Sequence, residues 1–189
     1  MKFKNKYIFI FMIFPSLLRA EVTVSEKFKY YSVYPVSKSG LLDELRNKSP
    51  ITEDGDVFFG YTYSSINWRF KWKYNSSKCW LTSVETSLES TYTMPKLETD
   101  YFWVKGVWDK WYPNLMKHEK GHHLIALEIA ELIQEGISNL SPQSSCSKLE
   151  NRANQIGFDY MEQLDVLNES YDLETNHGET EGASLFSYL

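Results

Sequence analysis

The sequence predicts an α+β fold, in which an antiparallel β-rich first half is followed by a motif-bearing helix packed against a second long helix. Between residues 22 and 92, aromatic and β-branched side chains occur in short stretches separated by turns, a pattern typical of strands. From about residue 100, apolar residues recur at steps of three and four, as on amphipathic helices. The 189 residues are enough for one domain of ordinary size.

The first half is expected to contain a series of strands and one short helix. The expected strands cover residues 22–34, 57–63, 67–74 and 79–92. The short helix is expected to open at Ser39-Gly40, with leucines on its apolar face. Pro95 is expected to end the last strand, because proline cannot donate a hydrogen bond in the middle of a sheet.

Two long helices are expected in the second half. The first begins near Asp100 and extends to about Ile137, and Pro113 within it either kinks the helix or lies in the first turn of a new one. The second is expected to begin at Ser141-Pro142, since serine caps helices and proline is tolerated in the first turn. Its apolar stripe consists of Cys146, Leu149, Ala153, Ile156, Tyr160, Leu164 and Leu167. Residues 168–189 show little periodicity.

The most informative motif is HExxH at residues 118–122. His118 and His122, four residues apart on a helix, lie on one face, where both rings can reach one metal ion. Glu119 lies beside that face and can accept a proton from a water that the metal activates, which is the arrangement of zinc hydrolases. The alternative is a solvated polar face. The apolar flanks favour a buried helix instead, in which two histidines and a glutamate need the compensation that a metal supplies.

A catalytic zinc ion usually has three protein ligands and one open position. His177, away from the motif and followed by a glycine, is the expected third ligand, because an antiparallel helix pair would return the chain to the motif helix. Glu150 and Glu128 are the rivals, at the spacings of a thermolysin-like and a metzincin-like third ligand respectively. His123 is not expected to bind the metal, because it lies about 100° around the helix from His122.

The N-terminus predicts export. Residues 1–20 combine a lysine-rich start, an apolar stretch and Ala20 at a cleavage position, so they are expected to be a signal peptide, followed by a single domain over residues 21–189. An uncleaved anchor is the alternative. Removal of residues 1–20 takes the net charge from −5 to −9, because they hold four basic and no acidic residues. An acidic body without a basic cluster argues against nucleic-acid binding and against membrane binding once the signal peptide is cleaved.

The chain has two cysteines, Cys79 and Cys146. In an exported protein, such a pair is expected to form a disulfide, here linking the strand region to the second long helix. Two separate buried thiols are the alternative. Neither cysteine lies in the short-spaced cluster typical of metal ligands.

Taken together, these residues resemble a bacterial family of predicted secreted zinc-dependent proteases, domain of unknown function 922. The segments that carry the resemblance are the aromatic strand before Cys79, Met94-Pro95, Trp108, residues 118–122 and residues 171–178. The last segment is similar to the family's YD-x-x-T-x-HG signature. Methionine at position 94 departs from the expected leucine. The resemblance covers most of the chain after residue 20 and implies a zincin-like α+β fold with a zinc site.

The expected function is that of a secreted or periplasmic zinc metallopeptidase that acts on a peptide or protein. Zn²⁺ is expected on His118, His122 and His177, with Glu119 as the general base. Tyr171 is a candidate donor to the oxyanion, or else an aromatic core residue. Asp172 is expected to orient a histidine ligand or to stabilise a turn. A non-catalytic zinc-stabilised binding module and a zinc amidase acting on cell-wall peptides remain as alternatives.

Overall fold

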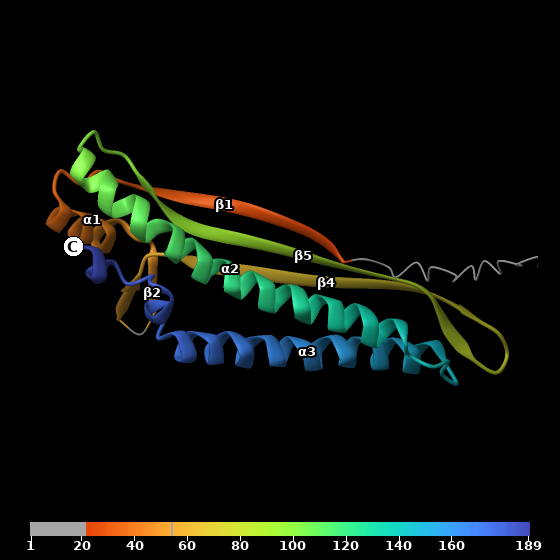
Figure 1. Cartoon of the computed structure of the whole chain (residues 1–189). Coiled ribbons are helices and arrows are strands. Elements are labelled where there is room, and N and C mark those ends of the chain that lie inside the picture. Colours follow the sequence, from red (N-terminus) through yellow and green to blue (C-terminus); the bar gives the residue numbers. More distant parts are fainter. Residues whose placement is uncertain (1–21, 54) are drawn as a thin grey trace, which may run out of the picture.

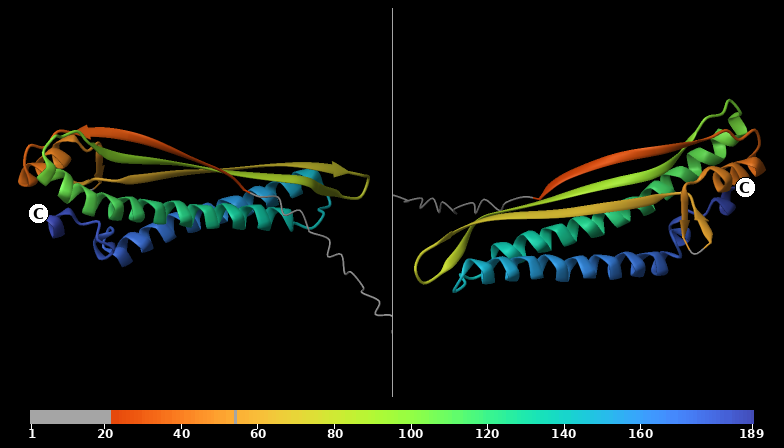
Figure 2. Two further views of the ribbon diagram at one scale, coloured as in Figure 1. Left: turned by 45° about the horizontal axis from the view of Figure 1, so that its top comes forward. Right: turned by 180° about the vertical axis from the view of Figure 1, so that it is seen from behind.

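The computed structural model describes residues 22–53 and 55–189. Two long helices lie on one face of a three-stranded sheet, which confirms the predicted α+β class (Figures 1 and 2). The strands are β1 (Thr23–Val33), β2 (Ile51–Glu53), β3 (Asp56–Phe58), β4 (Tyr61–Tyr74) and β5 (Cys79–Leu97), and the helices are α1 (Lys38–Lys48), α2 (Phe102–Ser138), α3 (Cys146–Thr175) and the 3₁₀ segments η1 (Glu179–Glu181) and η2 (Leu185–Tyr188). The expected signal peptide lies outside the described residues.

The main sheet has the order β1-β5-β4 and is mixed rather than antiparallel throughout. The β4–β5 pair is an antiparallel hairpin, but β1 pairs with β5 in parallel, from Thr23 opposite Ser87 to Val33 opposite Leu97. The expectation of a wholly antiparallel sheet is therefore wrong for β1. The reason is topological: β1 and β4 are joined at one end of the sheet through α1 and the small β2–β3 hairpin, and β5 then inserts between them.

The strand boundaries differ from the predictions in three places. The strand expected over residues 57–63 is divided between β3, which ends at Phe58, and β4, which begins at Tyr61. Residues 61–74 form one continuous strand, because the polar Ser64 and Ser65 still pair with β5. Strand β5 also passes through Pro95, which was expected to end it. Pro95 lies beyond Thr93, the last β5 residue paired with β4, so β5 has a neighbour there only on the β1 side, and proline can face the open side without breaking a ladder bond.

The helix boundaries also differ in part. Helix α2 is continuous through Pro113. Helix α3 begins at Cys146 with Ser145 as its cap, not at Ser141-Pro142. The chain before α3 is held in a bridge instead, in which the backbones of Cys79 and Gln143 exchange two hydrogen bonds of 2.8 Å. At its other end, α3 continues to Thr175, into the segment where no periodicity was recognised.

The predicted disulfide is confirmed. Cys79, at the start of β5, is bonded to Cys146, the first residue of α3. The cross-link therefore joins the β4–β5 hairpin to the second long helix at one end of the molecule (Figure 1).

The core consists of two apolar clusters separated by a polar layer. One cluster includes Ile66, Leu88 and the α2 residues from Ala126 to Ile137, and the other includes Tyr92, Met94 and the α2 residues from Val104 to Leu115. The HExxH motif lies on α2 between the two clusters. Over the described residues, none of the helices combines the length and apolar character needed to span a bilayer.

Candidate metal centre

Helix α3 returns antiparallel to α2 (Figure 1). His118 and His122 lie on one face of α2, and Asp172 of α3 lies against them. One carboxylate oxygen of Asp172, Oδ1, lies 3.2 Å from His118 Nε2 and 3.1 Å from His122 Nε2. The three ligand atoms all lie within 4.8 Å of one another. The predicted helix pair thus delivers a third potential ligand to the motif, but from α3 itself.

The other nitrogen of each imidazole is already engaged. His118 Nδ1 lies 3.2 Å from Glu181 Oε2, and His122 Nδ1 lies 3.0 Å from Asn168 Oδ1. Because these oxygens can only accept, both Nδ1 atoms donate, and the Nε2 lone pairs are left to face the carboxylate of Asp172. This is the pattern of metal-binding histidines, whose remote N–H is held by a carboxylate or carbonyl oxygen.

Three electron-pair donors that face one another repel unless a cation or a proton lies between them. Ligands at zinc distances and tetrahedral angles lie about 3.3 Å apart, close to the observed 3.1 and 3.2 Å. Burial alone would raise the pKa of Asp172, but the two imidazoles outweigh it and hold that pKa well below its usual value. Burial acts to lower the pKa of His122, yet its contacts with Asp172 and Asn168 raise it overall. The ligand types and their spacings fit a divalent metal ion, which would take the place of the protons on the imidazoles.

The motif glutamate is held in a fixed position beside this group. Glu119 is only 4% exposed, and its Oε2 accepts a 2.7 Å hydrogen bond from Thr62 on β4. Gly60 provides the space, since a Cβ at this position would lie 2.5 Å from Glu119 Oε1. Burial raises the pKa of Glu119, although the Thr62 bond and the two histidines oppose the rise. The carboxylate is therefore a better proton acceptor than an exposed glutamate.

Tyr171 packs on the motif itself. Its ring is stacked on His118 with a centroid distance of 5.0 Å, and its hydroxyl donates a 2.7 Å hydrogen bond to Glu181. Gly121 makes this possible, because any Cβ at that position would overlap the Tyr171 ring. Burial raises the pKa of Tyr171, and the Glu181 contact raises it further. In this structure, the residue fixes the orientation of the His118 ring.

The predicted third ligand lies beside the group but not within it. His177 Nδ1 is 4.0 Å from Asp172 Oδ1, and the side chain is 51% exposed. Asn176 and His177 both have a φ of 50°, and Gly178 follows at 80°. Gly178 also packs against His118, whose Cγ would lie 2.7 Å from an added Cβ. This left-handed turn holds His177 close to the site, and its role as a ligand stays a prediction.

The other candidates lie elsewhere. Glu128 is exposed on α2, and Glu150 lines a separate cavity with Trp68 near the start of α3. His123 is buried and its Nδ1 lies 2.8 Å from Ser90 Oγ on β5, in agreement with the expectation of a hydrogen-bonding rather than a metal-binding role.

Sequence reasoning missed the residues that support the ligands. Asn168 precedes Asp172 by one helical turn, so the two share a face once α3 is known to extend that far. Thr62 lies between the exposed Tyr61 and Tyr63 on β4, so strand alternation directs its side chain inward, which was a signal for a polar partner there. Glu181 lies in η1, and no local pattern marks it. Its position depends on the turn at residues 176–178.

The comparison with family models agrees with these elements. Residues 28–178 match the model described as a bacterial protein of unknown function, DUF922. The match extends from β1 to the turn after α3 and so includes every residue of the proposed ligand group. No curated protein and no solved structure matches the chain. Because the matched segment spans most of the sequence, this chain belongs to the DUF922 family of bacterial proteins.

Proposed function

We propose that this protein is an exported zinc-dependent hydrolase that cleaves peptide bonds. The observation that carries the proposal is the convergence of His118 Nε2, His122 Nε2 and Asp172 Oδ1 while both Nδ1 atoms are held by other oxygens. Two imidazoles and one carboxylate are a ligand set of known catalytic zinc sites, which leave a fourth position open. The three proposed zinc ligands are thus His118, His122 and Asp172, and His177 becomes the candidate for a further ligand.

A bound zinc ion would supply Lewis-acid chemistry, polarising the substrate carbonyl and acidifying a water molecule. The chain's own residues supply the proton transfer. Glu119, whose pKa is raised by burial, accepts the proton of the attacking water and passes it to the leaving amine. Thr62 holds the carboxylate for this step through its hydrogen bond to Oε2.

Tyr171 was a candidate donor to the oxyanion, with an aromatic core residue as the alternative, and we now propose a different role for it. Its hydroxyl donates to Glu181 in the structure, so donation to an oxyanion would require that bond to break first. Stacked on His118 and bonded to the same carboxylate as His118 Nδ1, Tyr171 acts as a positioning residue.

The decisive experiment combines metal analysis with one conservative variant. Purified protein should contain one zinc ion per chain, and a peptide library should be cleaved without but not with a chelator. Glu119→Gln should keep the zinc ion and lower kcat by about 10²–10⁴-fold, because only the proton acceptor is lost. Glu128→Gln, an exposed change on the same helix, serves as the control. Full activity of Glu119→Gln, or protein that binds no zinc, would refute the proposal.

A second function is favoured by one observation. The Nδ1 atom of His177 is 4.0 Å from Asp172 Oδ1, so a small side-chain rotation could make it a fourth ligand and close the site. A closed site is typical of structural zinc, which would make the protein a zinc-stabilised binding module. In that case, His177→Ala should lower zinc affinity sharply. For an enzyme with an open position, it should lower zinc affinity little. Cell-wall peptides belong in the substrate library because the same chemistry would serve an amidase.

A further inference from the structure

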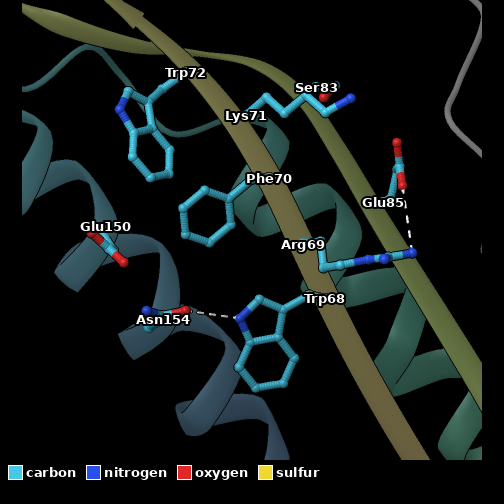
Figure 3. Close-up of a pocket in the computed structure, with 9 residues that line it drawn as sticks. All are labelled: Trp68, Arg69, Phe70, Lys71, Trp72, Ser83, Glu85, Glu150 and Asn154. Carbon is cyan, nitrogen blue, oxygen red and sulfur yellow. Dashed lines mark hydrogen bonds and ion pairs between the residues drawn. The ribbon is translucent and has the colours of Figure 1, made fainter.

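A cavity of about 500 Å³ is bordered by β4, by Ser83 and Glu85 on β5 and by the first turns of α3, apart from the metal centre. Figure 3 shows three aromatic rings, those of Trp68, Phe70 and Trp72, projecting from one side of β4 toward Glu150 and Asn154 on α3. The rings occupy alternate positions of the strand, so the pleat directs them to the same face. The cavity thus has an aromatic wall and a polar wall.

Both walls are fixed in place. Trp68 Nε1 donates a 3.1 Å hydrogen bond to Asn154 Oδ1, and the Trp68 ring packs so closely over Gly157 that a Cβ there would overlap it. The β4–β5 register shifts between Lys71 and Trp72, where Thr82 on β5 is the extra residue of a bulge, so the alternation of the rings along β4 is kept. The disulfide then ties the hairpin to the start of α3. The cavity is therefore a built feature of the fold.

The charge that faces the rings is negative. Arg69 and Lys71 also border the cavity, but they leave β4 on the side away from the rings, where Arg69 lies 3.8 Å from Glu85 (Figure 3). Glu150 faces the rings, and within the described residues it has no ion-pair partner. Aromatic faces attract cations, tryptophan most strongly, and a nearby carboxylate adds to this attraction. The whole chain is acidic, with a net charge of −5.

We propose that this cavity binds a basic side chain, lysine or arginine, of a peptide. The aliphatic part of the side chain would pack between the rings, and its charged end would meet Glu150 and the face of Trp72. A cation would be attracted both by the aromatic faces and by the Glu150 carboxylate, whereas an apolar side chain would gain only the contact with the rings, so the chemistry favours a cation.

Strand β4 also relates this cavity to the metal centre. Thr62, which holds Glu119, and Phe70, in the cavity, are eight residues apart on the same strand, which corresponds to about 26 Å. An extended peptide that reaches both places would have its basic residue about eight positions from the cleaved bond. This spacing rests on the proposed function, whereas the cavity's preference for a cation does not.

The test is a binding measurement on metal-loaded Glu119→Gln protein, in which hydrolysis cannot interfere. The probes are two fluorescein-labelled twelve-residue peptides of serine and alanine, one with a central lysine and one with norleucine in its place. We expect the lysine peptide to bind more tightly. Trp72→Leu should weaken its binding between about two- and thirtyfold, and Glu150→Gln about two- to fivefold. Glu162→Gln, an exposed change of the same charge on α3, should leave the affinity unchanged.

Three results would overturn the proposal. One is equal affinity for the two peptides, and another is an equal effect of Glu150→Gln and Glu162→Gln. The third is binding of a neutral oligosaccharide that Trp72→Leu abolishes and the lysine peptide does not displace. None of these depends on catalysis, so the cavity and the hydrolase proposal can fail separately. Native mass spectrometry of each variant with zinc shows whether the metal centre is intact throughout.

Discussion

The two ends of the helix pair hold their side chains in opposite ways. At the metal centre, the charged groups are largely buried and each has a partner: Glu119 is bound by Thr62, His118 by Glu181 and His122 by Asn168. At the aromatic cavity, Glu150 is exposed and has no ion-pair partner among the described residues. A disulfide joins the β4–β5 hairpin to α3 there. The metal centre is therefore held by hydrogen bonds, whereas the cavity is held by a covalent cross-link.

This difference predicts that the two ends respond to different perturbations. Buried ionisable groups are costly unless every member of the network is satisfied, so loss of one member of the metal centre should affect all the others. Metal binding should then be linked to folding. The cavity depends on the distance between a strand and a helix, so it should respond to the cross-link and be indifferent to the metal.

The largest effect is expected when the cross-link is removed. The double change Cys79→Ser and Cys146→Ser releases a loop closed over 67 residues and should lower the free energy of unfolding by about 4 kcal/mol on the chain-entropy model. Urea unfolding measures this loss. At urea concentrations where the variant is still folded, its zinc affinity should be unchanged, but its affinity for the lysine peptide should fall. An equal loss of both affinities would contradict the expected difference between the two ends.

A large effect is also expected from Asp172→Ala. Removal of a direct ligand should lower zinc affinity by more than the 10–100-fold typical of supporting residues, that is, by more than about 100-fold. Competition with a chromophoric chelator gives the affinity. Asp165→Ala, which removes an exposed carboxylate from the same helix, is the control and should change little. An unchanged zinc affinity of the Asp172→Ala variant would indicate that His177, not Asp172, is the third ligand.

Local periodicity explains which parts of the site were predictable. The common face of His118 and His122 follows from the helical repeat alone, and the disulfide follows from a pair of cysteines in a chain expected to be exported. The approach of the C-terminal segment follows from two long helices joined by a short turn. These features required no knowledge of how α3 is aligned along α2.

The parts that were missed depend on that alignment. Asp172 was expected to orient a ligand or to stabilise a turn, but the axial position of α3 places its Oδ1 atom close to both Nε2 atoms. The Cys79–Gln143 bridge, which delays the start of α3, is a contact between segments 64 residues apart. The parallel pairing of β1 and the passage of β5 through Pro95 likewise depend on which strands end where. Such tertiary choices override local propensity.

A pair of glycine variants tests how tightly the metal centre is packed. At Gly121 a new Cβ would overlap the Tyr171 ring, whereas at Gly106, on the same helix, it would meet nothing within 4 Å. Gly121→Ala should therefore cost about 1–3 kcal/mol of stability through overpacking. Gly106→Ala should stabilise by about 0.5–1 kcal/mol, because alanine is the better helix former. Thermal unfolding compares the two, and equal shifts would mean that Tyr171 does not rest on the motif.

The smallest effect, and the most specific, is expected from Glu181→Gln. Glu181 accepts from His118 Nδ1 and from the Tyr171 hydroxyl and lies 3.1 Å from Lys117, yet it falls beyond residue 178, where the family match ends. The carbonyl oxygen of glutamine can still accept both hydrogen bonds, which share Oε2 in the structure, but the charge that makes His118 a stronger ligand is lost. Zinc affinity should therefore fall about tenfold, at the lower limit for a supporting residue. Glu169→Gln, an exposed change on α3, should have no effect. If Glu181→Gln and Glu169→Gln have the same zinc affinity, the residues around the ligands contribute nothing to metal binding. The contrast between the two ends of the molecule would then be weaker than their geometry indicates.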